Sequence, residues 1–166
     1  MKNPDYIQKK IFSLPTLMQQ MARWKFLGKK TVFTNGCFDI LHQGHIFSLS
    51  QAAKEGDFLI VGVNSDDSVR RLKSSNRPVN HHSSRSLLIA SLIMVDAVIV
   101  FDEDTPLDLI TAIEPDVLVK GGDYTLDQIV GSKEVIAYGG RVVINPIVEG
   151  YSTTFIIEKI NAINES

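Results

Sequence analysis

Short apolar blocks recur along the chain, separated by polar segments in which apolar residues are three or four positions apart. Five blocks predict strands, at residues 30–34, 58–63, 97–101, 116–120 and 141–144. The block at 58–63 is apolar on both faces, as expected of a buried parallel strand. The intervening segments predict helices at 43–54, after a cap at Ser65, from Ser83 or Ser84 to about Met94, from Pro106 to before Pro115, near 132–138 and at 152–160. This alternation predicts an α/β fold, a Rossmann-like five-stranded parallel sheet with helices on both faces.

The segment before the first predicted strand differs from the rest. Apolar residues at helical spacing run through residues 5–27, Pro15 splits or restarts the helix, and Gly28 ends it. We therefore expect a helical appendage at residues 1–28, which covers the core or contacts a second copy, and a main domain at residues 29–166.

Charge and composition narrow the classes of function. The formal net charge is -2 with mixed signs, so no basic field favours nucleic acid. Cys37 is the only cysteine, which suits a reducing compartment. No N-terminal signal peptide is visible, and the longest apolar candidate, residues 87–101, is interrupted by Ser91 and Asp96. We expect a cytoplasmic protein that does not bind membranes.

The residues after each strand are the candidates for chemistry, because ligands of parallel sheets bind at the carboxyl ends of the strands. Residues 35–45 follow the first predicted strand and match neither a dinucleotide fingerprint nor a P-loop. They place His42 and His45 where a loop meets a helix N-terminus, a position that favours phosphate. Three interpretations stay open: phosphate-binding histidines, a helix cap plus a packed histidine, and a metal site that lacks an evident third ligand.

Two short motifs together indicate a family. Residues 34–45, with His42-Gln43-Gly44-His45 at their end, resemble the HxGH signature of the cytidylyltransferase-like nucleotidyltransferases, and Ser152-Thr153-Thr154 resembles the family's second signature. The resemblance implies the HxGH nucleotidyltransferase fold for residues 29–166. It also implies attack by a phosphate oxygen on the α-phosphorus of a nucleoside triphosphate, with Mg²⁺ as cofactor.

A narrower resemblance covers nearly all of residues 30–160. It rests on residues 64–66, 71–73, 77–80, 95–98, 101–106, 118–124 and 131–135, which resemble the adenylyltransferase domain of bacterial ADP-heptose synthases. That resemblance implies ATP and D-glycero-β-D-manno-heptose 1-phosphate as substrates, for lipopolysaccharide core biosynthesis. The chain shows no sugar kinase domain, so a separate heptose kinase is expected. His81-His82-Ser83-Ser84 replaces a segment that is usually more acidic.

The resemblance assigns roles to individual residues. We expect His42, His45, Lys73 and Arg85 to act on the phosphates. Asp39, Asn64 and Arg77 are expected to face the substrate, and Asp39 to contact either the sugar or a hydrated Mg²⁺. The nucleotide is expected to contact Asn35, Gly36, Cys37, Phe38, Gly44, Lys120, Gly121, Asp123, Ser152, Thr153 and Thr154. Lys73 and Arg77 lie on a polar loop that can close over the triphosphate. Cys37 is expected to be a packed thiol and not a nucleophile.

Two alternatives belong to other classes. A glycerol-3-phosphate cytidylyltransferase is the nearest, but the arginine of its Arg-Thr-Glu-Gly-Ile-Ser-Thr-Thr run has no match in residues 147–154. A nucleotide-binding regulatory subunit without turnover is the non-enzymatic alternative, and the intact histidine pair argues against it. The exposed side of the N-terminal helices suggests a homodimer.

Overall fold

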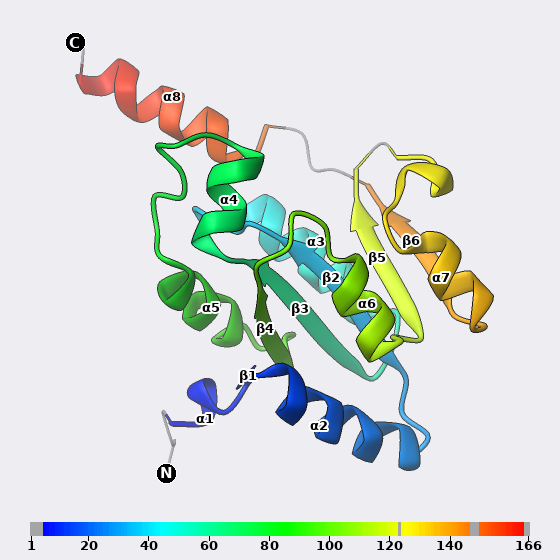
Figure 1. The fold of residues 1–166 in the computed structure, drawn as a ribbon. Helices are drawn as coiled ribbons and strands as arrows, with labels where there is room; N and C mark the ends of the chain where they lie inside the picture. Colours follow the sequence, from blue (N-terminus) through cyan, green and yellow to red (C-terminus); the bar gives the residue numbers. More distant parts are fainter. Residues whose placement is uncertain (1–4, 123, 147–149, 165–166) are drawn as a thin grey trace.

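A single parallel sheet organises the computed structural model, which describes residues 5–122, 124–146 and 150–164 (Figure 1). The strands lie in the order β1-β4-β3-β2-β5-β6, and all neighbours pair in parallel. The strands are β1 Ile11–Phe12, β2 Thr31–Gly36, β3 Phe58–Asn64, β4 Ala97–Phe101, β5 Val117–Gly121 and β6 Arg141–Asn145. The helices are α1 Asp5–Gln8, α2 Leu14–Phe26, α3 Gln43–Ala53, α4 Asp66–Leu72, α5 His82–Ala90, α6 Leu107–Ile113, the short 3-10 helix Leu126–Gln128, α7 Ser132–Ala137 and α8 Thr153–Asn164.

The predicted fold class is confirmed, but the predicted number of strands is wrong. The sheet has a sixth strand, β1, in which Ile11 pairs with Val98 and Phe12 with Ile99 of β4. Two residues are too short to show the alternation of a strand, and the helical spacing on either side conceals them. Pro15 restarts the helix as expected, since it stands in the first turn of α2 after the N-cap residue Ser13.

Helices cover both faces of the sheet, and each face has its own apolar core. Alternate residues of one strand point to opposite faces, so Val32 joins one core and Phe33 the other. The first core draws on α2, α6 and α7, through residues such as Leu17, Ile110 and Val135. The second draws on α3 and α5. The predicted helix that was to end near Met94 stops at Ala90, because residues 91–94 form turns before β4.

The N-terminal segment is attached to the sheet by packing as well as by β1. Leu17 is fully buried, and the Trp24 ring stacks on Phe58 of β3 with ring centroids 4.3 Å apart. Lys10 Nζ donates a hydrogen bond to the carbonyl of Val95 at 2.7 Å. The segment therefore completes one core and one sheet edge, while the domain boundary at residue 28 stays a prediction.

We expect Leu17→Ala to destabilise the whole domain. The change leaves a cavity in a core shared with β2, β3 and β5, at a cost of about 2–5 kcal/mol in the free energy of unfolding. Urea unfolding should show one transition that moves to lower denaturant. Met18→Ala is the matched control, because that neighbouring side chain is exposed. If the wild type instead showed a separate early transition that Leu17→Ala removed, while the main transition did not move, residues 1–28 would fold apart from the domain.

The connection order fixes where a ligand can bind. From β2 the chain moves outward to β3 and β4, and then returns to β5 on the other side of β2. The carboxyl ends of β2 and β5 therefore border the point at which strand order reverses, where parallel sheets bind ligands.

No helix in the described part of the chain is both long and apolar enough to cross a membrane.

Candidate active site

A cleft of about 680 Å³ opens at the carboxyl ends of β2 and β5. Its volume lies within the range of small-molecule sites, roughly 300–1,000 Å³. Most of the residues predicted from the sequence line it. They come from β2 and the loop after it, the start of α3, β3, the 73–81 loop, β5 and the start of α8. They are Asn35, Gly36, Cys37, Phe38, Asp39, His42, His45, Asn64, Lys73, Arg77, Lys120, Ser152, Thr153 and Thr154. The fold thus brings together motifs more than 100 residues apart in the sequence.

Three predicted residues in the described part of the chain are not among those lining the cleft. Gly44 and Gly121 lie beside it, and Arg85 is fully buried behind it. Asp123, the candidate for the ribose hydroxyls, lies outside the described residues.

His42 and His45 form a stacked pair at the N-terminus of α3. Their ring centroids are 3.8 Å apart and their planes are inclined by 24°. His42 is the N-cap residue, but its side chain makes no capping hydrogen bond, so the capping interpretation does not describe this ring. The Nδ1 atoms of both rings are buried and lack a hydrogen-bond partner among the described residues. Both residues nevertheless line the cleft, beside the positive end of a helix dipole, so the pair can meet a ligand there.

The environment keeps this pair neutral in the free protein. Burial, and to a smaller extent the neighbouring His42, lower the pKa of His45 to about 4. Burial also lowers the pKa of His42. An anionic phosphate beside the rings would favour their protonated form, so charge developing on a phosphate would be met by hydrogen bonds from groups that are already in place.

We expect the titration of His45 to lower the free energy of unfolding in acid. Its pKa is about 4 in the folded protein and about 6.5 when unfolded, so the unfolded chain binds more protons between these values. The free energy of unfolding should therefore fall as the pH drops from about 6.5 to about 4, and should be independent of this group above that window. His45→Asn removes the titration, so the difference between the two unfolding curves isolates it. If the free energies of unfolding of the wild type and of His45→Asn changed in parallel across this pH range, the burial assigned to His45 would be contradicted.

Phe38 holds the pocket loop in an unusual conformation. Its φ is 48°, in the left-handed region that bulky residues avoid, and its ring meets the edge of the His45 ring at a centroid distance of 5.2 Å. Gly36 gives this ring room, because a Cβ there would lie 3.1 Å from it. Gly44 does the same for the His42 ring, which a Cβ would also approach to 3.1 Å. The two glycines shape the site by admitting side chains.

Lys120 and Asn35 join the two strands at the switch point. Lys120 Nζ donates to Asn35 Oδ1 at 3.3 Å, and burial lowers the pKa of Lys120. A phosphate in the cleft would replace this weak partner with a full negative charge. Cys37 lies nearby, where burial raises the pKa of its thiol. This disfavours a thiolate and agrees with a packed, non-nucleophilic role.

Asp39 anchors the 73–81 loop. Its Oδ1 accepts hydrogen bonds from the backbone N–H groups of Val79 at 2.7 Å and Asn80 at 3.0 Å, and its Oδ2 accepts one from Arg77 Nε at 2.5 Å. The carboxylate is thus occupied on both oxygens and almost fully buried. This favours an anchoring role over the predicted contact with the sugar or a hydrated Mg²⁺. Arg77 stays partly exposed at the cleft, where it can face an anion.

Arg85 was predicted to touch phosphate, and the structure gives it a different place. Its side chain is fully buried. It donates to the carbonyls of Asn80 at 2.8 Å and Cys37 at 2.6 Å, and to Asp66 Oδ1 at 2.6 Å. A guanidinium held this way fixes the cleft loop against α4 and α5. We therefore replace the predicted phosphate contact with a positioning role.

The second motif stands at the start of α8. Ser152 Oγ accepts a hydrogen bond from the backbone N–H of Phe155 at 3.0 Å and so caps the helix. Thr153 and Thr154 follow it in the first turn, and all three residues line the cleft. Hydroxyl groups and the helix N-terminus are thus placed to receive an anion.

Several lining residues were not predicted. They are Leu72, Asp104, Thr105, Pro106, Leu118, Tyr124, Gln128, Ile129, Val130 and Tyr151. Asp104, Thr105 and Pro106 follow β4, so the rule that ligands bind after strands could have found them. Tyr124 and Tyr151 lie next to predicted motifs, but nothing in the sequence marks them as residues of the site.

The cleft is more basic than the chain as a whole. Three of the described lining residues are basic, Lys73, Arg77 and Lys120, and two are acidic, Asp39 and Asp104. Arg77 is paired with Asp39, and Asp104 is paired with Arg71 at 2.6 Å, so Lys73 and Lys120 supply the excess positive charge. A concave site with this balance concentrates anions although the net charge of the protein is -2.

Comparison with known proteins agrees with this geometry. A model of the cytidylyltransferase-like family matches residues 33–159, so the chain belongs to that family. Both sequence motifs fall inside the matched range, and the resemblance drawn from them is confirmed.

Curated relatives show which members of the family this chain resembles in sequence. The chain is 52% identical over 152 residues to the bifunctional protein HldE of Koribacter versatilis, and 53% identical over 151 residues to that of Geobacter sulfurreducens. These matches cover 92% and 91% of this chain but only 31% of each relative. Among solved structures, a lipopolysaccharide core biosynthesis protein from Thermoplasma volcanium superposes with a TM-score of 0.61 at 32% identity, covering 75% of this chain and 100% of that one. A pantoate-β-alanine ligase from Francisella tularensis, at 16% identity and a TM-score of 0.57, shares the fold.

Proposed function

We propose that the protein transfers AMP from ATP to D-glycero-β-D-manno-heptose 1-phosphate, giving ADP-heptose and pyrophosphate. The observation that carries the proposal is the stacked His42–His45 pair, open to a basic cleft at a helix N-terminus. The relatives named HldE and the lipopolysaccharide core biosynthesis protein support the choice of sugar and of pathway.

The reaction needs positioning and charge neutralisation more than acid–base chemistry. A phosphate oxygen of the sugar phosphate, already anionic at neutral pH, forms a bond to the α-phosphorus of ATP. The bond between that phosphorus and the oxygen bridging to the β-phosphate breaks, and pyrophosphate leaves with the electron pair. No proton has to be removed from the nucleophile, so no general base is required.

The described residues divide this work. His42 and His45 donate to the α- and β-phosphates, where negative charge moves as the bond breaks. Thr153, Thr154 and the N-terminus of α8 receive the β- and γ-phosphates, and Lys120 approaches from β5. Lys73 and Arg77 stand on the 73–81 loop and line the cleft, where they meet the phosphates. Asn64, whose side chain donates to Ser68 Oγ at 3.0 Å, borders the substrate.

Mg²⁺ fits this site as a partner of the phosphates. The ion prefers six oxygen ligands, whereas the carboxylates of Asp39 and Asp104 in the cleft are engaged by Arg77 and Arg71. The phosphates would therefore hold most of it, with the hydroxyl groups of Thr105 and Thr153 at hand in the cleft wall. When bound, it supplies additional neutralisation of phosphate charge.

Pyrophosphate release tests the proposal. ATP and CTP are each paired with heptose 1-phosphate and with glycerol 3-phosphate, in the presence of Mg²⁺. Release with ATP and the heptose phosphate alone is the expected result. Release with CTP and glycerol 3-phosphate would assign the protein to the cytidylyl branch. Binding of nucleotide without release in any pair would favour a regulatory subunit.

The cellular setting follows from the proposed substrates. A heptose kinase must supply the sugar phosphate, and ATP as donor places the reaction in the cytoplasm. We also propose a homodimer that uses the exposed apolar end of α2, where Phe26 is 91% and Leu27 is 66% exposed. Sedimentation equilibrium of the wild type and of Phe26→Ser tests this assembly.

A further inference from the structure

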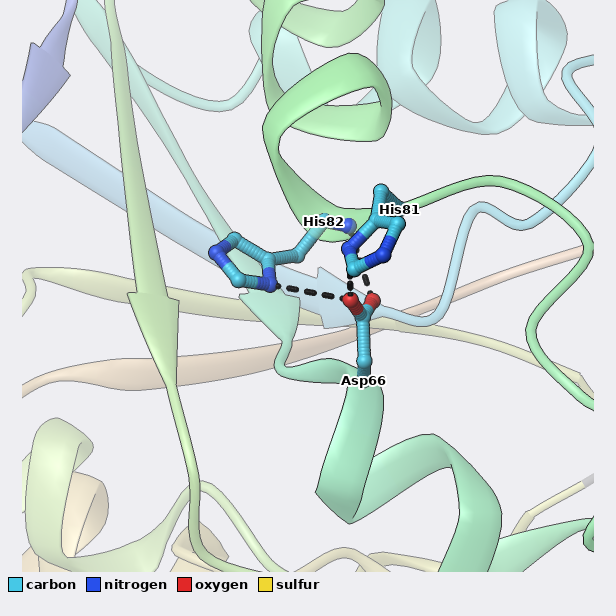
Figure 2. Close-up of side chains that lie close together, drawn as sticks. All are labelled: Asp66, His81 and His82. Carbon is cyan, nitrogen blue, oxygen red and sulfur yellow. Dashed lines mark hydrogen bonds and ion pairs between the residues drawn. The ribbon is translucent and has the colours of Figure 1, made fainter.

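Three potential metal ligands meet outside the cleft. Asp66 is the first residue of α4, while His81 and His82 stand at the start of α5. Figure 2 shows the two imidazole rings beside one carboxylate. Asp66 Oδ2 lies 2.5 Å from His81 Nδ1 and 3.2 Å from His82 Nδ1, and one ligand atom from each residue lies within 4.8 Å of the others.

The two oxygens of Asp66 have different surroundings. Oδ1 accepts hydrogen bonds from Arg85 Nη2 at 2.6 Å and from the backbone N–H of His82 at 2.7 Å. These donors orient the carboxylate so that Oδ2 faces the two rings. Metal-binding carboxylates are oriented in the same way by outer partners, which hold one oxygen while the other binds the ion.

The ligand types select a class of ion. Two imidazole nitrogens and one carboxylate oxygen suit Zn²⁺ and similar transition metals, whereas Mg²⁺ prefers oxygen alone. Ligand bonds of about 2.0–2.1 Å place tetrahedral neighbours about 3.3 Å apart, so the separation of His81 Nδ1 from Asp66 Oδ2 would have to grow by less than about 1 Å. The side chain of His81 is 79% exposed, which leaves it free to make this shift and leaves a coordination position open to water.

The geometry points to a binding site for a divalent transition metal, such as Zn²⁺, formed by Asp66, His81 and His82. The site is distinct from the phosphate-bound Mg²⁺ of the proposed reaction. Arg85 links it to the cleft, because this side chain bridges Asp66 to the carbonyl of Cys37. A bound ion would fix the C-terminal end of the 73–81 loop to α4. Because Arg85 already offsets the charge of Asp66, we expect weaker binding than at a closed four-ligand site.

Metal titration of the full chain tests this site without reference to catalysis. Co²⁺ is added while visible absorption is followed, and Zn²⁺ is then measured by competition with a chromogenic chelator. The wild type should take up one equivalent with the absorption of a low-symmetry site. His81→Ala and His82→Ala should each weaken binding by at least about tenfold, the lower end of the loss caused by removing even an outer partner.

Two controls make the result specific. Ser83→Ala and Ser84→Ala alter exposed neighbours in the same turn and should bind as the wild type does. The double variant His42→Ala/His45→Ala removes the other imidazole pair and should keep the site. Binding that survives both His81→Ala and His82→Ala, or that vanishes in the double variant, would overturn the assignment. Since His81 is exposed, its loss leaves the fold intact, and circular dichroism confirms this for each variant.

Discussion

Replacing His45 by alanine should lower the rate of AMP transfer by about a hundred- to a thousandfold, the loss seen when one preorganised donor to a developing charge is removed. The ring lies against His42 and faces the cleft, and its Nδ1 has no partner among the described residues. Substrate binding uses several other groups, so the loss should fall on kcat more than on KM. Steady-state pyrophosphate release measures both constants.

The matched control for this prediction lies on the same helix. Ser50→Ala changes a residue of α3 that does not line the cleft, and its kcat should equal that of the wild type. An unchanged kcat in His45→Ala would show that the pair is a packing feature. Nucleotide transfer would then have to rely on Lys73, Lys120 and the α8 motif.

Replacing Asp39 by alanine should lower the free energy of unfolding by about 3–5 kcal/mol, as expected when one partner of a buried ion pair is removed. The change leaves Arg77 without its partner and two backbone N–H groups, of Val79 and Asn80, without their acceptor. Urea unfolding should show a lower midpoint with an unchanged slope. The 73–81 loop should also become accessible to proteases.

An exposed ion pair provides the comparison for Asp39. Asp67 pairs with Arg70 at 3.4 Å on the surface of α4, and Asp67→Ala should cost at most about 1 kcal/mol. Asp39→Asn keeps one acceptor oxygen and should fall between the two variants. Equal effects of Asp39→Ala and Asp67→Ala would mean that the loop is held by other contacts.

Much of the fold was predictable because its elements carry strong local signals. The block at 58–63 is apolar throughout and became β3, and Gly139-Gly140 follows α7 as a stop signal should. The two-residue strand β1 could not be predicted, since its pairing with β4 depends on a partner 87 residues away. The strand is defined by its pairing with β4, and its two residues are too few to show a sequence pattern.

Part of the candidate site was likewise predictable from the sequence, and part of it was not. The histidine pair and the Ser152–Thr154 motif were predicted from local sequence, and the structure places both in one cleft. The roles of Asp39 and Arg85 were not, because burial and hydrogen-bond partners decide whether a charged side chain meets a ligand or holds a loop. Arg85 illustrates this point: its three partners come from three separate segments.

Isotope tracing follows the oxygens of the sugar phosphate through the proposed reaction. The phosphate of heptose 1-phosphate is labelled with ¹⁸O at its three non-bridging oxygens, and the products with ATP are analysed by mass spectrometry. We expect ADP-heptose that carries all three labels, together with unlabelled pyrophosphate, because the labelled oxygen attacks the α-phosphorus. Label in the pyrophosphate, or AMP in place of ADP-heptose, would contradict it.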